Sequence, residues 1–151
     1  MAKRFTRREE IPPNALFSVQ VRRAGEVQHY DVYFEEDGIR FEYLGGYWEG
    51  VKPFAGPGKR QDMFLYSILK KRRRETGESR GEDFRINYDD VVKVEILRRE
   101  EDAKITIWLK NGRWVEMRIP AKIYDLAYKL LKRHLEKRLR EKGGWVVRRA
   151  R

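Results

Sequence analysis

Alternating apolar and polar positions predict two neighbouring strands near the start of the chain. Phe17, Val19 and Val21 alternate with polar residues over 17–22, and a second alternation runs over about 27–36. This period of two is typical of strands that bury one face. The apolar residues of the second alternation are Tyr30, Val32 and Phe34.

A turn at Asp37-Gly38 follows the second alternation. Both residue types tolerate positive φ, so the pair predicts a two-residue hairpin turn. The predicted register pairs Phe34 with Phe41, Val32 with Tyr43 and Glu35 with Arg40, so that apolar side chains and opposite charges face each other.

Three further strands are predicted over 92–97, 105–109 and 114–119. A two-residue loop at Asn111-Gly112 would place Ile107 opposite Glu116 and bring a charge to the buried face. A three-residue loop with Gly112 in the left-handed region avoids this. The resulting register pairs Ile107 with Val115, Ile105 with Met117 and Trp108 with Trp114.

Two helices are predicted from apolar residues at helical spacing. A short one covers about 61–75, after a Gly- and Pro-rich loop over 45–60. Pro120 begins a long one that ends near Lys142, before Gly143-Gly144. The apolar stripe of the long helix comprises Ile123, Leu126, Ala127, Leu130, Leu131, Leu135 and Leu139.

This order of elements predicts an α+β fold, a bent antiparallel sheet or small barrel capped by the long carboxyl-terminal amphipathic helix. We expect a basic amino-terminal arm over 1–14, one domain over 15–142, and a basic carboxyl-terminal tail over 143–151. Within the domain, 45–83 forms a loop and a helix inserted after the third strand.

The stretch 84–95 (Phe-Arg-Ile-Asn-Tyr-Asp-Asp-Val-Val-Lys-Val-Glu), the following two strands and the closing helix resemble the carboxyl half of pleckstrin-homology-like domains of the GRAM or bacterial type. Residues 33–41 similarly resemble the early hairpin of that family. The resemblance implies a binding module without catalysis, for phosphoinositides, other anionic lipids or protein partners. Its phosphoinositide-binding members carry several Lys and Arg around the first hairpin loop, where this chain has Arg22 and Arg23 and no lysine.

The chain has 151 residues, 40% of them hydrophobic, which is enough for one domain with a true core. It has no cysteine, which excludes disulfides and thiolate metal sites. Charged residues make up 39%, a balance seen in heat-adapted proteins. No run reaches the roughly 20 apolar residues of a membrane span, and the start of the chain lacks the pattern of a signal peptide. We therefore expect a cytoplasmic protein.

No catalytic or metal-binding pattern is evident, so we expect neither an enzyme nor a cofactor. His29 and His134 are far apart and lack the spacing of metal ligands. The serines lack a nucleophile elbow, and the glycines over 56–58 do not complete a phosphate loop. Acidic clusters fall at predicted turns and strand edges, where solvated carboxylates are common.

The net charge of +11 is unevenly distributed. Residues 120–151 hold eleven basic and three acidic groups, whereas 70–74 hold five basic groups and none that is acidic. The candidate phosphate-binding residues are Lys70, Lys71, Arg72, Arg73, Arg74, Lys129, Arg133, Lys137, Arg140, Arg148, Arg149 and Arg151. Trp145 beside the last arginines is a candidate for stacking on a base.

Each of these stretches also has a structural interpretation. Cations over 70–74 stabilise the end of a helix through its dipole, and the pair Glu136–Arg140 suits an ordinary charged surface. Trp145 could instead be buried in a short strand formed by the tail. The Trp108–Trp114 pair is an exposed aromatic platform or a second layer of core, depending on what covers it.

Together these features favour a non-enzymatic nucleic-acid-binding domain. RNA or ribosome association is favoured over sequence-specific DNA binding, since no recognition-helix or zinc-finger pattern is present. The alternative is a pleckstrin-like module that binds anionic membrane surfaces or a protein partner. No small-molecule substrate is evident from the sequence.

Overall fold

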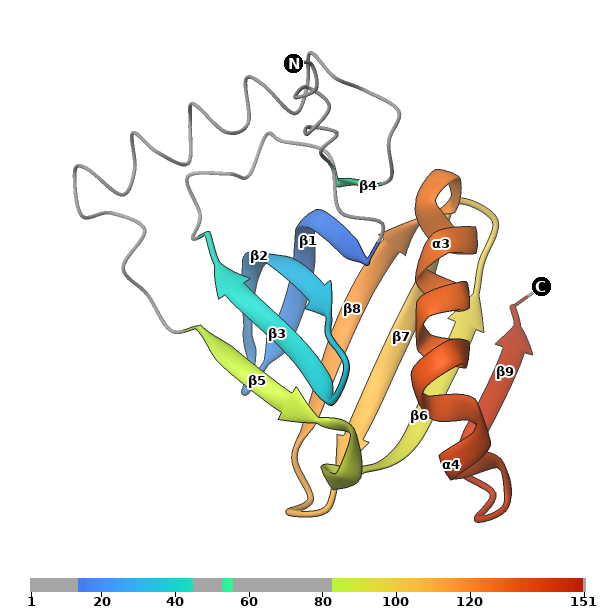
Figure 1. Ribbon diagram of the computed structural model, residues 1–151. Helices are drawn as coiled ribbons and strands as arrows, with labels where there is room; N and C mark the ends of the chain where they lie inside the picture. The colour runs from blue at the N-terminus through green and yellow to red at the C-terminus, as the bar shows by residue number, and fades with distance from the viewer. Residues whose placement is uncertain (1–13, 45–52, 56–82, 151) are drawn as a thin grey trace, which may run out of the picture.

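The computed structural model describes residues 14–44, 53–55 and 83–150 of the chain. Their strands form one curled sheet in the order β5-β3-β2-β1-β8-β7-β6-β9, with β4 paired to β1 (Figure 1). The strands are β1 (Ala15–Arg23), β2 (Glu26–Phe34), β3 (Gly38–Tyr43), β4 (Phe54–Ala55), β5 (Phe84–Asn87), β6 (Val91–Arg98), β7 (Asp102–Leu109), β8 (Trp114–Pro120) and β9 (Trp145–Arg149).

Strand β1 connects the two halves of the curled sheet, since it pairs with β2 along one edge and with β8 along the other. Two antiparallel meanders are joined in this way, and the long helix lies across the inside of the curl (Figure 1). The buried core comes from the inward-facing positions of both meanders and includes Val32, Phe41, Ile105 and Leu131. This half-barrel with a carboxyl-terminal helix confirms the expected α+β curled sheet.

The β2–β3 hairpin has a different register from the one predicted. Phe34 lies opposite Ile39 and Val32 opposite Phe41, so each partner is two residues earlier than expected. Gly38 is not in the turn but in β3, where a Cβ atom would lie 2.6 Å from the backbone oxygen of Ile86. The prediction of an Asp37-Gly38 turn was wrong because this glycine is needed for the close approach of β5.

The β7–β8 hairpin confirms the three-residue loop. Gly112 has φ +87°, and its N–H donates to the oxygen of Leu109 at 3.0 Å. The predicted pairs Ile107–Val115, Ile105–Met117 and Trp108–Trp114 are all present.

The long helix begins directly after β8 and has a wider turn in its middle. It comprises α3 (Ala121–Leu131), a π-helical turn (Lys132–Glu136) and α4 (Lys137–Arg140). Leu131, Leu135 and Leu139 recur every four residues, and such a row drifts around an α-helix of 3.6 residues per turn. The wider π turn offsets this drift and keeps all three leucines buried. Gly143, at φ +74°, ends the helix, as the sequence predicts.

The segment expected to be a basic tail, 143–151, contributes the last strand of the sheet. Strand β9 runs parallel to β6, with Trp145 beside Val94 and Val147 beside Ile96. The tight turn at Gly144 makes this return possible, because a Cβ atom there would lie 2.4 Å from the oxygen of Val92. The sheet is therefore mixed, whereas the sequence predicted a purely antiparallel one.

Two expectations fall on residues that are not described, the amino-terminal arm up to residue 13 and the inserted helix over about 61–75. Asn14 is described, and its side-chain amide donates to the oxygen of Phe34 at 2.9 Å. In the described part of the chain, no helix has the length and apolar character needed to cross a membrane.

Candidate functional site

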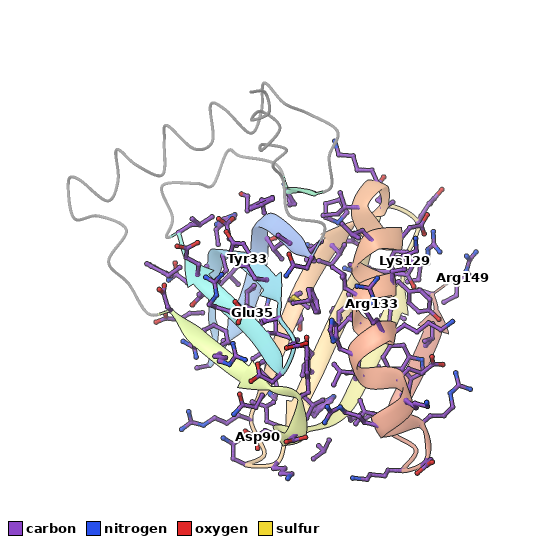
Figure 2. The ribbon with its side chains drawn as sticks, viewed as in Figure 1. Tyr33, Glu35, Asp90, Lys129, Arg133 and Arg149 are labelled. Atoms are coloured by element: carbon purple, nitrogen blue, oxygen red, sulfur yellow. The ribbon has the colours of Figure 1, made fainter. Side chains whose placement is uncertain are left out.

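The exposed side of the helix carries a row of cations. Lys129, Arg133, Lys137 and Arg140 are all exposed, on the side opposite the buried leucines. Figure 2 shows Lys129 and Arg133 on this helix and Arg149 on the neighbouring strand β9. The structure thus places the predicted helix residues on the same side as Arg149, whereas Arg148 alternates to the other face of the sheet, where Glu95 lies.

Aromatic rings line the boundary between the helix and β9. Tyr124 and Tyr128 lie one turn apart with centroids at 5.7 Å, and Trp145 lies 6.2 Å from Tyr128. The guanidinium carbon of Arg98 lies 4.2 Å from the Tyr124 ring centroid, and Lys132 Nζ lies 5.8 Å from that of Tyr128. Cations and aromatic rings therefore alternate along this boundary, which joins the helix to β6 and β9.

Arg98 and Arg149 are register neighbours on the parallel strands β6 and β9. Like charges at neighbouring positions of a sheet repel each other and cost stability. Both arginines also act on Tyr124. Burial raises the pKa of Tyr124, and the positive charges of Arg98 and Arg149 oppose that rise. A bound anion would relieve the repulsion between the two arginines.

Two of the predicted phosphate-binding arginines are paired with acidic side chains. Arg140 is ion-paired with Glu136, as predicted, and Arg148 Nη2 lies 3.2 Å from Glu95 Oε2. The arginines of these pairs are exposed and screened by solvent, so the pairs restrain them only weakly. We define the cationic surface as Arg98, Lys129, Lys132, Arg133, Lys137, Arg140 and Arg149.

Trp145 is half-buried and packs against the core beside Tyr128. Of the two alternatives for Trp145, the structure therefore shows the one in which the tail returns as a short strand and partly buries the ring. A base could reach the rim of Trp145 but not lie across a fully exposed ring. The other predicted residues, Lys70, Lys71, Arg72, Arg73, Arg74 and Arg151, lie outside the described residues.

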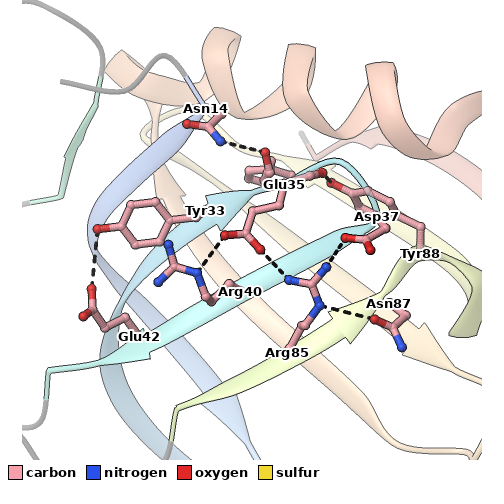
Figure 3. A network of polar contacts seen from close by, with 10 residues as sticks. Asn14, Tyr33, Glu35, Asp37, Arg40, Glu42, Arg85, Asn87 and Tyr88 are labelled. Carbon is pink, nitrogen blue, oxygen red and sulfur yellow. Dashed lines mark hydrogen bonds and ion pairs between the residues drawn. The ribbon is translucent and has the colours of Figure 1, made fainter. Parts of the chain in front are cut away.

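The acidic cluster at 35–37 belongs to an ion-pair network that joins the hairpin to β5 (Figure 3). Glu35 Oε2 accepts from Arg40 Nε at 2.8 Å, and Arg85 is paired with both Glu35 and Asp37. The hydrogen bonds from Arg40 and Arg85 lower the pKa of Glu35. The hydroxyl of Tyr88 donates to the oxygen of Glu35 at 2.7 Å. These carboxylates hold strands together and are not a candidate acid–base pair.

Among the described residues, neither histidine belongs to a group of three or more His, Asp or Glu side chains that could hold a metal ion. His134 lies in the π turn and stacks on Tyr88 with centroids at 4.8 Å. Burial, followed by the charges of Arg133 and Arg138, lowers its pKa. Its role is in packing the helix against the core.

The two tryptophans that share a cross-strand position are half-buried on the outer face of the sheet. The centroids of Trp108 and Trp114 lie 6.3 Å apart, and the rings are tilted by 54°. Neither alternative for this pair applies fully, because the rings are neither fully exposed nor part of the core.

A groove of about 1080 Å³ is present at the open end of the half-barrel. Its walls come from the β1–β2 turn, the end of β3, β5 and the β7–β8 turn. The residues that line it include the aromatic residues Tyr30, Tyr43, Phe84 and Trp114, together with Arg23 and Arg113. Sequence reasoning missed this groove because its residues come from four separate segments.

Sequence reasoning also missed Arg98, Tyr124 and Tyr128 as members of the surface around β9. The two tyrosines were identifiable as an aromatic pair at i and i+4 on a cationic helix. Arg98 had no local signal, since it joins the surface through a parallel pairing with a strand about fifty residues later.

No known protein family matches this chain, and neither does any curated protein.

Proposed function

We propose that the chain is a non-enzymatic nucleic-acid-binding domain whose cationic surface contacts the phosphate backbone. The observation that carries the proposal is the pairing of Arg98 with Arg149 beside the cations of the helix. Two adjacent guanidinium groups bind phosphate oxygens well, because each offers several N–H donors in a fixed geometry. A backbone of regularly spaced phosphates matches a surface of several such groups.

The aromatic boundary supports RNA or single-stranded nucleic acid over sequence-specific duplex DNA. Tyr128 and Trp145 are half-buried and accompany the cations. Stacking of bases on aromatic side chains is tolerant of sequence and typical of single-strand binding. The helix also bears its cations along its whole exposed side, which suits contacts to a backbone more than readout of base edges.

The fold supports a pleckstrin-homology-like assignment as part of the same proposal. Two antiparallel meanders are followed by a closing helix, and strand β5 leads through Tyr88 into β6 where the resemblance places its pattern. On this assignment, residues 45–83 are an insertion between β3 and β5 that includes β4. The family resemblance implies binding without catalysis, which agrees with the proposed activity.

The test is a salt titration of binding to a labelled single-stranded RNA and to a duplex of the same length. We expect binding to both, with affinity falling steeply between about 50 and 200 mM salt. For duplex DNA the log–log slope is about −0.9 for each phosphate contacted. Absent binding, or binding that does not depend on salt, contradicts the proposal.

Anionic vesicles are the competing partner in a second arm. A cationic surface near a charged membrane gains about 1 kcal/mol for each Lys or Arg. If nucleic acid is the partner, excess RNA displaces the protein from phosphatidylserine vesicles. Retention on the vesicles in excess RNA would instead identify the protein as a membrane-surface module.

A further inference from the structure

The groove at the open end of the half-barrel is a second concave site, separate from the cationic surface. Its floor is the end of the core, where Val21, Ile86 and Val115 are buried. Its volume of about 1080 Å³ is at the upper end of the roughly 300–1,000 Å³ typical of ligand pockets. A ligand of nucleotide size or larger can therefore enter it.

The charges around the groove suit a ligand with one anionic group. Arg85 is paired with Glu35 and Asp37, and Glu26 lies opposite Arg23 in the β1–β2 register. Arg113 in the β7–β8 turn has an exposed side chain that also lines the groove. Arg113 is thus the cation best placed to hold an anionic group at the rim.

The walls of the groove suit a planar group. The guanidinium carbon of Arg23 lies 3.7 Å from the ring centroid of Phe84, which stacks on Phe41 at 4.3 Å. Tyr43 and Tyr30 line the groove beside Phe84. Aromatic rings and guanidinium planes are the surfaces on which proteins stack unpaired bases.

Two amide side chains complete the site. Gln28 accepts a hydrogen bond from the hydroxyl of Tyr43 at 3.2 Å through Oε1, which leaves its amide nitrogen as a donor. Asn111 Oδ1 accepts a hydrogen bond from the backbone N–H of Arg113 at 2.9 Å. This leaves the amide nitrogen of Asn111 as a donor as well. Amide groups of this kind recognise the acceptor atoms on the edge of a base.

We propose that this groove binds a nucleoside phosphate, with the base stacked on Arg23 beside Phe84 and Tyr43 and the phosphate held by Arg113. The ligand is a free nucleotide or an unpaired nucleotide of a strand, because both present the same base and phosphate. The proposal rests on the groove alone and does not need the cationic surface to bind nucleic acid.

Calorimetric titration of the full chain with four probes tests the proposal. The probes are adenosine monophosphate, adenosine, ribose 5-phosphate and inorganic phosphate. We expect saturable binding of the nucleotide, tighter than that of any fragment, because base and phosphate occupy different parts of the groove. A nucleotide affinity weaker than about 1 mM, or equal binding of ribose 5-phosphate, overturns the assignment.

A matched pair of variants locates the site. Arg113→Ala should weaken nucleotide binding about tenfold, the effect of losing one hydrogen bond to a charged group, and leave adenosine binding unchanged. Lys110→Ala removes an equally exposed cation from the same turn but does not line the groove, so it should have no effect. Equal losses in the two variants would overturn the proposal.

Nuclear magnetic resonance and competition complete the test. Nucleotide-induced amide shifts should cluster at Gln28, Tyr43 and Asn111, and shifts confined to the helix and β9 would overturn the proposal. A single-stranded oligonucleotide that displaces the nucleotide identifies a strand as the natural source, whereas failure to displace it identifies the free nucleotide. Because duplex DNA cannot insert a paired base, duplex binding reports on the cationic surface separately.

Discussion

Arg149 on β9 lies beside Arg98 on β6 in a parallel register, and the charges of both act on Tyr124 of the helix. The two arginines lie on the edge strand of the sheet and on the strand next to it. Their pairing has no stabilising role of its own, since two adjacent cations repel each other. It supports the proposed binding role, because an anion between the two groups would convert repulsion into attraction.

The repulsion predicts that the two arginines of β9 have opposite effects on stability. Arg149→Gln relieves the repulsion with Arg98 and should raise the free energy of unfolding by about 0.2–1 kcal/mol. Arg148→Gln removes the ion pair with Glu95 and should lower it by roughly 0–1 kcal/mol. Urea unfolding at low salt measures both, and a loss of stability in Arg149→Gln would contradict this account.

Gly38 should not tolerate a side chain. A Cβ atom would lie 2.6 Å from the backbone oxygen of Ile86, so β3 and β5 must separate in Gly38→Ala. Forcing extra atoms into such a contact costs about 1–3 kcal/mol. Chemical unfolding measures the decrease in stability, with Glu36→Ala in the adjacent exposed turn as the control. Equal stability of the two variants would show that this close approach is not needed.

His134 should make stability depend on pH in mildly acidic solution. Burial and the charges of Arg133 and Arg138 lower its pKa in the folded state below the ordinary 6.5. The unfolded chain therefore takes up a proton at a higher pH than the folded chain does. Stability is full above about pH 6.5 and falls as the pH decreases from there toward the folded-state pKa.

The variant His134→Phe keeps a ring against Tyr88 but cannot be protonated. Its free energy of unfolding should therefore lack this part of the pH dependence, and the gap between the two proteins should change between about pH 7 and pH 5. Thermal unfolding across this range measures the effect. Parallel pH profiles for the two proteins would show that His134 is not the group responsible.

The sequence predicts one hairpin register correctly and the other incorrectly for a physical reason. At β7–β8, the alternative register shifts the pairing by one residue, which exchanges the buried and exposed faces and brings Glu116 against Ile107. At β2–β3, the true register differs by two residues, which leaves every side chain on the same face. The alternation of apolar residues therefore cannot distinguish the two β2–β3 registers, and the contact of Gly38 with β5 decides between them.

The candidate sites show the same limit. Lys129 and Arg133 could be predicted because they lie on one face of a helix whose period is visible in the sequence. The pairing of Arg98 with Arg149 could not, since β9 is a short strand with no alternation of its own and pairs far from its place in the chain. The groove is equally hidden, because Arg23 and Arg113 line it together only once β1 pairs with β8.

The most direct test of the account is the salt dependence of nucleic-acid binding after charge reversal on the cationic surface. The double variant Arg133→Glu, Arg149→Glu changes two exposed cations on the helix and β9. The control, Arg22→Glu with Lys110→Glu, makes the same change in charge at exposed positions on β1 and in the β7–β8 turn. Both proteins therefore have the same net charge.

We expect the surface variant to bind duplex DNA at least about tenfold more weakly than the control. The magnitude of its log–log salt slope should fall by about 0.9 for each phosphate that the variant no longer neutralises. The control should bind nearly as the parent chain does. Equal slopes and affinities for the two variants would show that only net charge matters, and would contradict a binding surface formed by the helix and β9.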